Sequence, residues 1–257
     1  EGGNMESKEK CYWCGVDATS KEHVPPKCLF PEDKDIQKIA HDTFRKNLIT
    51  VPSCDAHNLE KSHEDEYLMA CLGGGVLNNE VAYIHTHTKI KRARDRNINL
   101  LDVDSEDEVV ANDKRYPVQW INIETPRLIS AFEAIARALY FHEFSERYSG
   151  MFYTISPILF MQPDDKDANA FQIRSATLIE NERPYWKTDI KGDNPKVFTY
   201  QFSPEDGMRT RTLVLTFYEK TKVYIAMSKL SEKEFETIKR KSKPMQQILF
   251  GDIIKDL

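Results

Sequence analysis

A stripe of apolar residues at three- and four-residue steps runs through residues 126–148. The positions that mark it are Leu128, Phe132, Ile135, Leu139 and His142. This spacing is typical of a helix that buries one face, and Pro126 fits the first turn of such a helix. The pattern predicts a helix over 126–148, in which His142 has a structural role.

After Gly150 the pattern changes to short runs of β-branched and aromatic residues separated by turn residues. The runs are 152–160, 171–178, 197–202, 210–217 and 223–227. Such runs predict strands, and we expect an antiparallel sheet packed on the 126–148 helix. A last helix over about 231–241 is predicted from Ser231 and Glu234, which have the spacing of a capping box.

The first third of the chain has a different pattern of apolar and turn residues. Residues 58–72 read as a helix, and the glycine run 73–75 ends it. We therefore place a domain boundary there, with one unit over 6–75 and a second over 76–257. No phosphate-binding loop, dinucleotide fingerprint or internal repeat is present in the second unit.

Two charged segments follow this boundary. A basic stretch within 76–98 contains Lys89, Lys91, Arg92, Arg94 and Arg96. It fits an electrostatic contact with phosphate, and equally a solvated helix face. The acidic run over 102–108 reads as a loop or linker.

Composition narrows the class of protein. The 36 Lys and Arg residues and 41 Asp and Glu residues give a net charge of −5, which argues against a histone-like binder of nucleic acid. With 40% hydrophobic residues the chain can form a sizeable core. It has no apolar run of membrane-spanning length, and its polar N-terminus is not expected to be a signal peptide.

The five cysteines include two short-spaced pairs. Cys11 and Cys14 form a C-x2-C knuckle followed by Gly15, and Cys54 and His57 form a C-x2-H pair. An odd cysteine count without an export signal favours a reducing, cytoplasmic setting, where such pairs more often bind metal than form disulfides. Four such ligands suit tetrahedral zinc; the alternative is four unrelated residues. The other two cysteines, Cys28 and Cys71, are expected to be small buried hydrophobes.

An acid and a histidine stand side by side between the two pairs, as Glu22-His23. In a strand these side chains point to opposite faces, so Glu22 could bind a metal while His23 approaches a water molecule. Beyond the second pair, Asn58, Lys61 and Ser62 would share one face of a helix.

The order C-x2-C, E-H-V-x-P, C-x2-H-N-x2-K over about residues 8–72 resembles the HNH (ββα-metal) endonucleases, in the subgroup with a structural zinc knuckle. The resemblance implies that Glu22 and Asn58 hold a catalytic divalent cation, that His23 is the general base, and that Asn47, a loose match, orients it. It also implies zinc at Cys11, Cys14, Cys54 and His57. The expected fold is α+β: a small zinc-stapled ββα-metal module, then an α+β domain with a mostly antiparallel sheet packed on helices.

The chemistry is coherent with this resemblance. Oxygen ligands suit Mg²⁺ or Mn²⁺, an imidazole can be a base near neutral pH, and Lys61 can meet a phosphate as a point charge. Each residue also has a simpler interpretation: His23 as a turn histidine, Asn58 as a helix-start residue, Lys61 as a solvated charge.

We therefore expect a metal-dependent endonuclease that acts on DNA, with RNA as an open alternative. The resemblance further implies a bacterial role against foreign DNA such as phage, together with a partner ATPase or sensor protein. The rival interpretation is a zinc-stabilised nucleic-acid-binding or adaptor module that does not cut.

Overall fold

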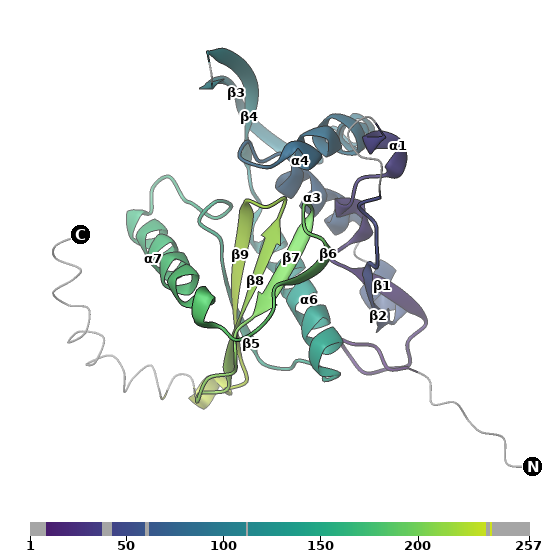
Figure 1. The fold of residues 1–257 in the computed structure, drawn as a ribbon, viewed down its shortest axis with the longest axis vertical. Coiled ribbons are helices and arrows are strands. Elements are labelled where there is room, and N and C mark those ends of the chain that lie inside the picture. The colour runs from purple at the N-terminus through teal and green to yellow at the C-terminus, as the bar shows by residue number, and fades with distance from the viewer. Residues whose placement is uncertain (1–8, 38–42, 60–61, 112, 235–236, 238–257) are drawn as a thin grey trace, which may run out of the picture.

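The computed structural model describes residues 9–37, 43–59, 62–111, 113–234 and 237, and its strands form three antiparallel sheets. A two-stranded sheet pairs β1 (Ser20–Val24) with β2 (Ile49–Ser53), and a hairpin pairs β3 (Asp102–Ala111) with β4 (Lys114–Asn122). The third sheet has five strands in the order β5-β9-β8-β7-β6 (Figure 1). These strands are β5 (Met151–Ile155), β6 (Lys191–Asn194), β7 (Phe198–Phe202), β8 (Thr210–Phe217) and β9 (Thr221–Ser228).

Helices lie between and beside these sheets, so the predicted α+β fold is confirmed. In chain order they are α1 (Asp33–Ile36), α2 (Asp55–Leu59), α3 (Ser62–Gly73), α4 (Glu80–His85), α5 (Lys91–Arg96), α6 (Thr125–Phe144) and α7 (Lys166–Glu182). A π-helical turn, Thr86–Ile90, joins α4 to α5, and short 3-10 turns occupy Lys27–Leu29 and Arg183–Tyr185. Among the described residues, no helix is both long and apolar enough to cross a membrane.

The five-stranded sheet is covered on both faces, as its sequence pattern requires. Along β8 and β9, Leu213 and Ile225 face the main core, while the alternating positions Val214 and Tyr224 face a smaller cluster with Ala176 of α7. On the main-core face, the rings of Phe132 in α6 and Phe217 in β8 lie 6.0 Å apart. The predicted packing of the sheet on the 126–148 helix is thus confirmed, although His142 is exposed rather than part of the buried stripe.

A single hydrophobic core joins the segments before and after the glycine run. It contains Val24 and Leu29 from the first segment together with Phe132 and Ile225 from the second. The buried hydroxyl of Tyr218 donates to the carbonyl oxygen of Leu29 at 2.7 Å. The helix α6 contacts β1 and β2 as well as β5 and β9. The two segments therefore pack as one body, with α6 between the small sheet and the large one.

Two predicted strands differ in the structure. Residues 171–178 lie within α7, because the side chain of Asp165 accepts the backbone N–H of Ala168 and starts a helix there. The strand predicted over 152–160 ends at Ile155. Beyond it, the hydroxyl of Ser156 donates to the carbonyl of Lys222, and Pro157 cannot donate to a strand ladder.

The acidic run over 102–108 was predicted to be a loop or linker. This prediction is wrong, because the run forms most of strand β3. Its hairpin with β4 projects from the body of the molecule (Figure 1). Cross-strand partners satisfy several of its acids: Arg115 donates to Glu108 at 3.1 Å and Gln119 donates to Glu106 at 2.8 Å. β-branched residues between the acids favour the strand.

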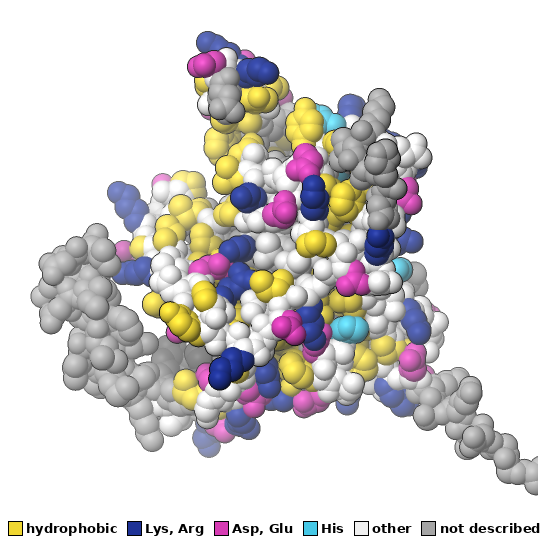
Figure 2. All heavy atoms as spheres, in the orientation of Figure 1, with side chains coloured by type: hydrophobic (Ala, Val, Ile, Leu, Met, Phe, Trp, Pro, Cys, Tyr) yellow, Lys and Arg dark blue, Asp and Glu magenta, His cyan; other side chains and the backbone are white. Residues whose placement is uncertain are grey.

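Most of the basic stretch on the π-turn and α5 is paired with acids, and Arg94 donates instead to the amide oxygen of Gln119. Arg92 forms two hydrogen bonds with Asp35, at 2.7 and 3.0 Å, and Arg96 contacts Glu66 at 2.8 Å. Lys89 and Lys91 also have acidic partners. Over the face that Figure 2 shows, Lys and Arg side chains alternate with Asp and Glu rather than forming one continuous basic area. These pairs favour the interpretation of a solvated helix face.

At the end of the described chain, the capping box predicted before the last helix is present. The Oγ of Ser231 accepts from the N–H of Glu234 at 3.3 Å, and the Glu234 carboxylate accepts from the N–H of Ser231 at 2.7 Å. Of the rest of that predicted helix, residues 235–236 and 238–241 lie outside the described residues.

Candidate metal centre and adjoining pocket

The C-x2-C knuckle is a tight turn pinned to the small sheet. The N–H of Gly15 donates to the carbonyl of Cys11 at 3.0 Å, and Gly15 has a φ of +77°, a conformation that favours glycine. The N–H of Tyr12 donates to the carbonyl of Pro52 in β2 at 2.9 Å. The second pair follows β2 directly, so the same sheet positions both pairs.

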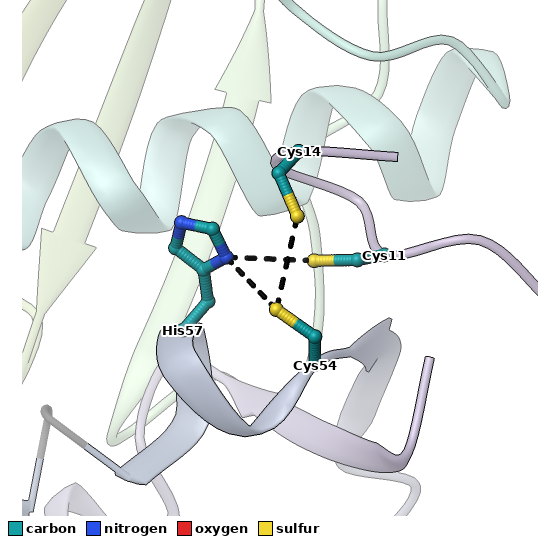
Figure 3. Close-up of side chains that lie close together, drawn as sticks. All are labelled: Cys11, Cys14, Cys54 and His57. Atoms are coloured by element: carbon teal, nitrogen blue, oxygen red, sulfur yellow. Dashed lines mark hydrogen bonds between the residues drawn. The ribbon is translucent and has the colours of Figure 1, made fainter. Parts of the chain in front are cut away.

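Cys11, Cys14, Cys54 and His57 come together, as predicted, with all four ligand atoms within 4.8 Å of one another (Figure 3). The Sγ atoms of Cys14 and Cys54 lie 3.7 Å apart, and the Nδ1 atom of His57 lies 3.1 Å from the Sγ of Cys54 and 3.8 Å from that of Cys11. A tetrahedral zinc with bonds of about 2.3 Å requires sulfur–sulfur distances of about 3.8 Å. The cluster could therefore hold a metal ion such as zinc.

The surroundings of this cluster favour a thiolate at Cys11 and fix the imidazole of His57. Burial opposes ionisation of Cys11, but the backbone N–H groups of Cys14, Trp13 and Cys54 outweigh it and lower the pKa of the Cys11 thiol to about 6. The indole of Trp13 stacks on the ring of His57, with centroids 4.8 Å apart. A thiolate and a fixed imidazole are what a zinc site requires.

The two remaining cysteines behave as predicted. Cys71 is buried in the core, and Cys28 packs against it. Burial raises the pKa of each thiol to about 12. Both are therefore protonated near neutral pH.

Glu22 and His23 lie on β1, opposite Val51 and Thr50 of β2. The hydroxyl of Ser53 donates to Glu22 Oε2 at 3.4 Å. Burial and the nearby Glu22 carboxylate raise the pKa of Tyr12. Burial lowers the pKa of His23, and the positive charges of Lys27 and Arg45 lower it further. His23 is thus neutral near pH 7, the state in which an imidazole accepts a proton.

A pocket of about 510 Å³ adjoins the cluster, and both Glu22 and His23 line it. Its other walls come from two helices. Glu64 and Asp65 line it from α3, and Arg127, Ser130, Ala131 and Ala134 line it from α6. His57 of the metal cluster also lines this pocket, so the cluster and the Glu22-His23 pair border the same space.

Three other predicted site residues have different surroundings. The amide nitrogen of Asn58 donates to Ser20 Oγ at 2.8 Å, and Asn58 is absent from the pocket lining that the structure describes. The amide of Asn47 donates to Asp193 at 2.7 Å, toward the large sheet. Lys61 lies outside the described residues.

Sequence reasoning did not find the helix α6 side of the pocket. Arg127 donates to Glu64 at 2.5 Å and to Glu124 at 3.2 Å, and its guanidinium lies 3.9 Å above the ring of Tyr67. It stands more than a hundred positions beyond His23, with no motif around it. Its only signal was its place at the start of the predicted 126–148 helix.

Comparison of the chain with family models, curated proteins and solved structures finds no match.

Proposed function

We propose that this chain is a metal-dependent endonuclease of the HNH type that hydrolyses phosphodiester bonds in DNA. The observation that carries the proposal is the pocket in which Glu22 and His23 lie together beside the Cys/His cluster. The order β1, β2, α2 around them is the order that the resemblance to ββα-metal nucleases implies. Structural zinc would hold this unit together, since its ligands come from the turn before β1 and from the start of α2.

In this proposal His23 is the general base. Its lowered pKa keeps the imidazole neutral near pH 7, and its place in the pocket wall exposes it to water and substrate. The imidazole takes a proton from water as the water oxygen bonds to phosphorus. The phosphorus–oxygen bond to the leaving strand breaks, and the leaving oxygen takes a proton from solvent.

Glu22 would hold the catalytic cation, Mg²⁺ or Mn²⁺. One or two carboxylates together with substrate phosphate and water are a common ligand set for Mg²⁺, and the Glu22 carboxylate in the pocket wall fits that set. When bound, such a cation stabilises negative charge on the phosphate and the leaving oxygen. Asn58 would provide a further ligand to the cation once its amide no longer donates to Ser20. Ser20 lies two residues before Glu22 on the same face of β1.

Lys61 as a phosphate contact stays a prediction. For Asn47 we propose a positioning role through the loop before β2, because its amide holds Asp193 rather than His23. A bacterial role against foreign DNA, with a partner ATPase or sensor protein, is proposed from the family resemblance alone.

Plasmid cleavage tests the enzyme against the rival, a binding or adaptor module. The engagement of Asn58 with Ser20 favours that rival. Purified protein is incubated with supercoiled plasmid and Mg²⁺ or Mn²⁺, beside His23→Ala and the control His142→Ala, whose histidine is exposed on α6. We expect wild type and His142→Ala to nick the plasmid and His23→Ala to lose at least a hundredfold in rate. DNA binding without cleavage in all three proteins would favour the adaptor.

A further inference from the structure

We propose that the substrate enters the pocket as an unpaired strand, so that the chain cuts single-stranded DNA or an unpaired stretch within a duplex. This inference rests on the proposed function and names the form of its substrate. It comes from the shape of the pocket, the charges that line it and the pairing of the basic residues outside it.

The size of the pocket is the first argument. Glu22 and His23 are both partly buried, and helix α6 lies across the small sheet that carries them. A pocket of about 510 Å³ has the volume of a cube about 8 Å on edge. The major groove of a duplex is itself about 12 Å wide, so a complete double helix cannot follow its phosphate into this space. A single nucleotide unit can, since such volumes are usual for small-molecule sites.

The charge inside the pocket is the second argument. Among the described lining residues, Glu22, Glu64 and Asp65 are acids and Arg127 is the one Lys or Arg. With a divalent cation at Glu22, the formal charges of this lining sum to zero, so the first bound phosphate already makes the pocket negative and each further phosphate adds repulsion. A second strand would bring further phosphates close to Glu64 and Asp65. The repulsion between these negative charges is screened less in a partly buried site than in water.

The small side chains of α6 form the rest of the wall. Ser130, Ala131 and Ala134 leave the space opposite β1 open. A base attached to the bound phosphate would lie against these residues, and acid side chains can accept hydrogen bonds from base amino groups. In a duplex one hydrogen of each amino group is used in pairing and the other is reached only through a groove, whereas an unpaired base offers both.

The third argument comes from the surface outside the pocket. Proteins that hold a duplex neutralise many phosphates with Lys and Arg. Here Lys89, Lys91, Arg92 and Arg96 are paired with acids of the same chain, and Arg94 donates to Gln119. This basic segment therefore offers little free positive charge to a long, highly charged duplex, while one flexible strand needs few contacts.

The experiment compares three DNA substrates of one sequence with Mn²⁺: a single strand, a full duplex, and a duplex with a central unpaired bubble. We expect the single strand to be cut at least tenfold faster than the duplex, with cuts in the third substrate confined to the bubble. The logarithm of the apparent affinity for the strand should fall with the logarithm of salt with a slope smaller than about 2, the value for two to three phosphate contacts.

Ala131→Leu narrows the pocket from α6 without touching Glu22 or His23. We expect it to cut the single strand at least tenfold more slowly, while the control Ala170→Leu, at a half-exposed position in α7, cuts it as wild type does. Hydrolysis of bis(p-nitrophenyl) phosphate by the wild type and by Ala170→Leu checks that the catalytic site works without a nucleic-acid strand. Circular dichroism and melting temperature check that both variants fold.

The outcomes separate this inference from the proposed function. Equal or faster cleavage of the full duplex, or unchanged cleavage of the strand by Ala131→Leu, overturns the inference and leaves the nuclease intact. Absence of all hydrolysis, including that of the small diester, overturns the proposed function and this inference with it.

Discussion

The hydroxyl of Tyr218 donates to the carbonyl oxygen of Leu29 across 189 positions of the chain, at 2.7 Å and fully inside the core. Tyr218→Phe removes the donor and leaves this buried carbonyl without it. We expect the free energy of unfolding to fall by about 1–3 kcal/mol, measured by urea denaturation. Tyr185→Phe is the control, because Tyr185 is 82% exposed and its change should have no effect.

The metal cluster predicts a defined zinc content. Wild-type protein should contain about one zinc ion per chain, and Cys14→Ser should lose most of it because a tetrahedral site needs four ligands. Elemental analysis after dialysis measures this, and the melting temperature should fall with the zinc. Cys71→Ala and His23→Ala should keep the metal; zinc loss in His23→Ala would place that residue in the zinc site.

Buried His85 predicts a loss of stability in mild acid. Its Nε2 lies 3.0 Å from the carbonyl oxygen of Cys28, its Nδ1 is buried, and burial lowers its pKa to about 4. The unfolded state, with a pKa near 6.5, binds the proton first, so stability is full above about pH 6.5 and falls toward pH 4. Between pH 7 and pH 5 the loss is about 2 kcal/mol.

Urea denaturation at several pH values between 7 and 5 measures this slope. His85→Gln retains a side-chain N–H for the Cys28 carbonyl. Its free energy of unfolding should change less with pH over the same range. An equal slope in the variant would assign the loss to other groups, among them His23, whose lowered pKa acts in the same direction.

The lowered pKa of His23 also predicts the pH dependence of hydrolysis. A general base works in its unprotonated form, so kcat/KM should rise with pH and level off above the pKa of His23. Because burial and the charges of Lys27 and Arg45 lower that pKa, the midpoint of the acid limb should lie below 6.5. A midpoint at or above 6.5 would contradict the assignment.

The projecting hairpin should be dispensable for folding. The described side chains of β3 and β4 are exposed apart from Val118 and Ile121, which are half-buried. Replacing residues 104–120 by an Asn-Gly turn should change the free energy of unfolding by less than about 0.5 kcal/mol. A large loss would show that the hairpin supports the core.

Local signals predicted the parts of the site that lie close in sequence. Ligand spacing predicted the Cys/His cluster, and the acid beside a histidine at Glu22-His23 marked that pair as candidate site residues. The apolar stripe predicted α6 within a few residues. Each of these depends on contacts between near neighbours or on a simple period.

The pocket could not be predicted in the same way. It exists because α6 packs against β1, and no motif near Arg127 in the sequence indicates that Arg127 and His23 line one pocket. Asn47 shows the same limit, since its partner Asp193 comes from strand β6 of the large sheet. The strand predicted at 171–178 was wrong because the cap at Asp165 outweighed the β-branched composition that follows it.

The bond between Tyr218 and Leu29 also sets an order of events during synthesis. At about 5–20 residues per second, the ribosome needs about 10–40 s to travel the 189 positions between them. Throughout that interval Glu22 and His23 have been synthesised while β9, which helps to complete the shared core, has not. The nascent N-terminal segment is thus a poor independent folding unit, and its core is completed only after β8 and β9 have been made.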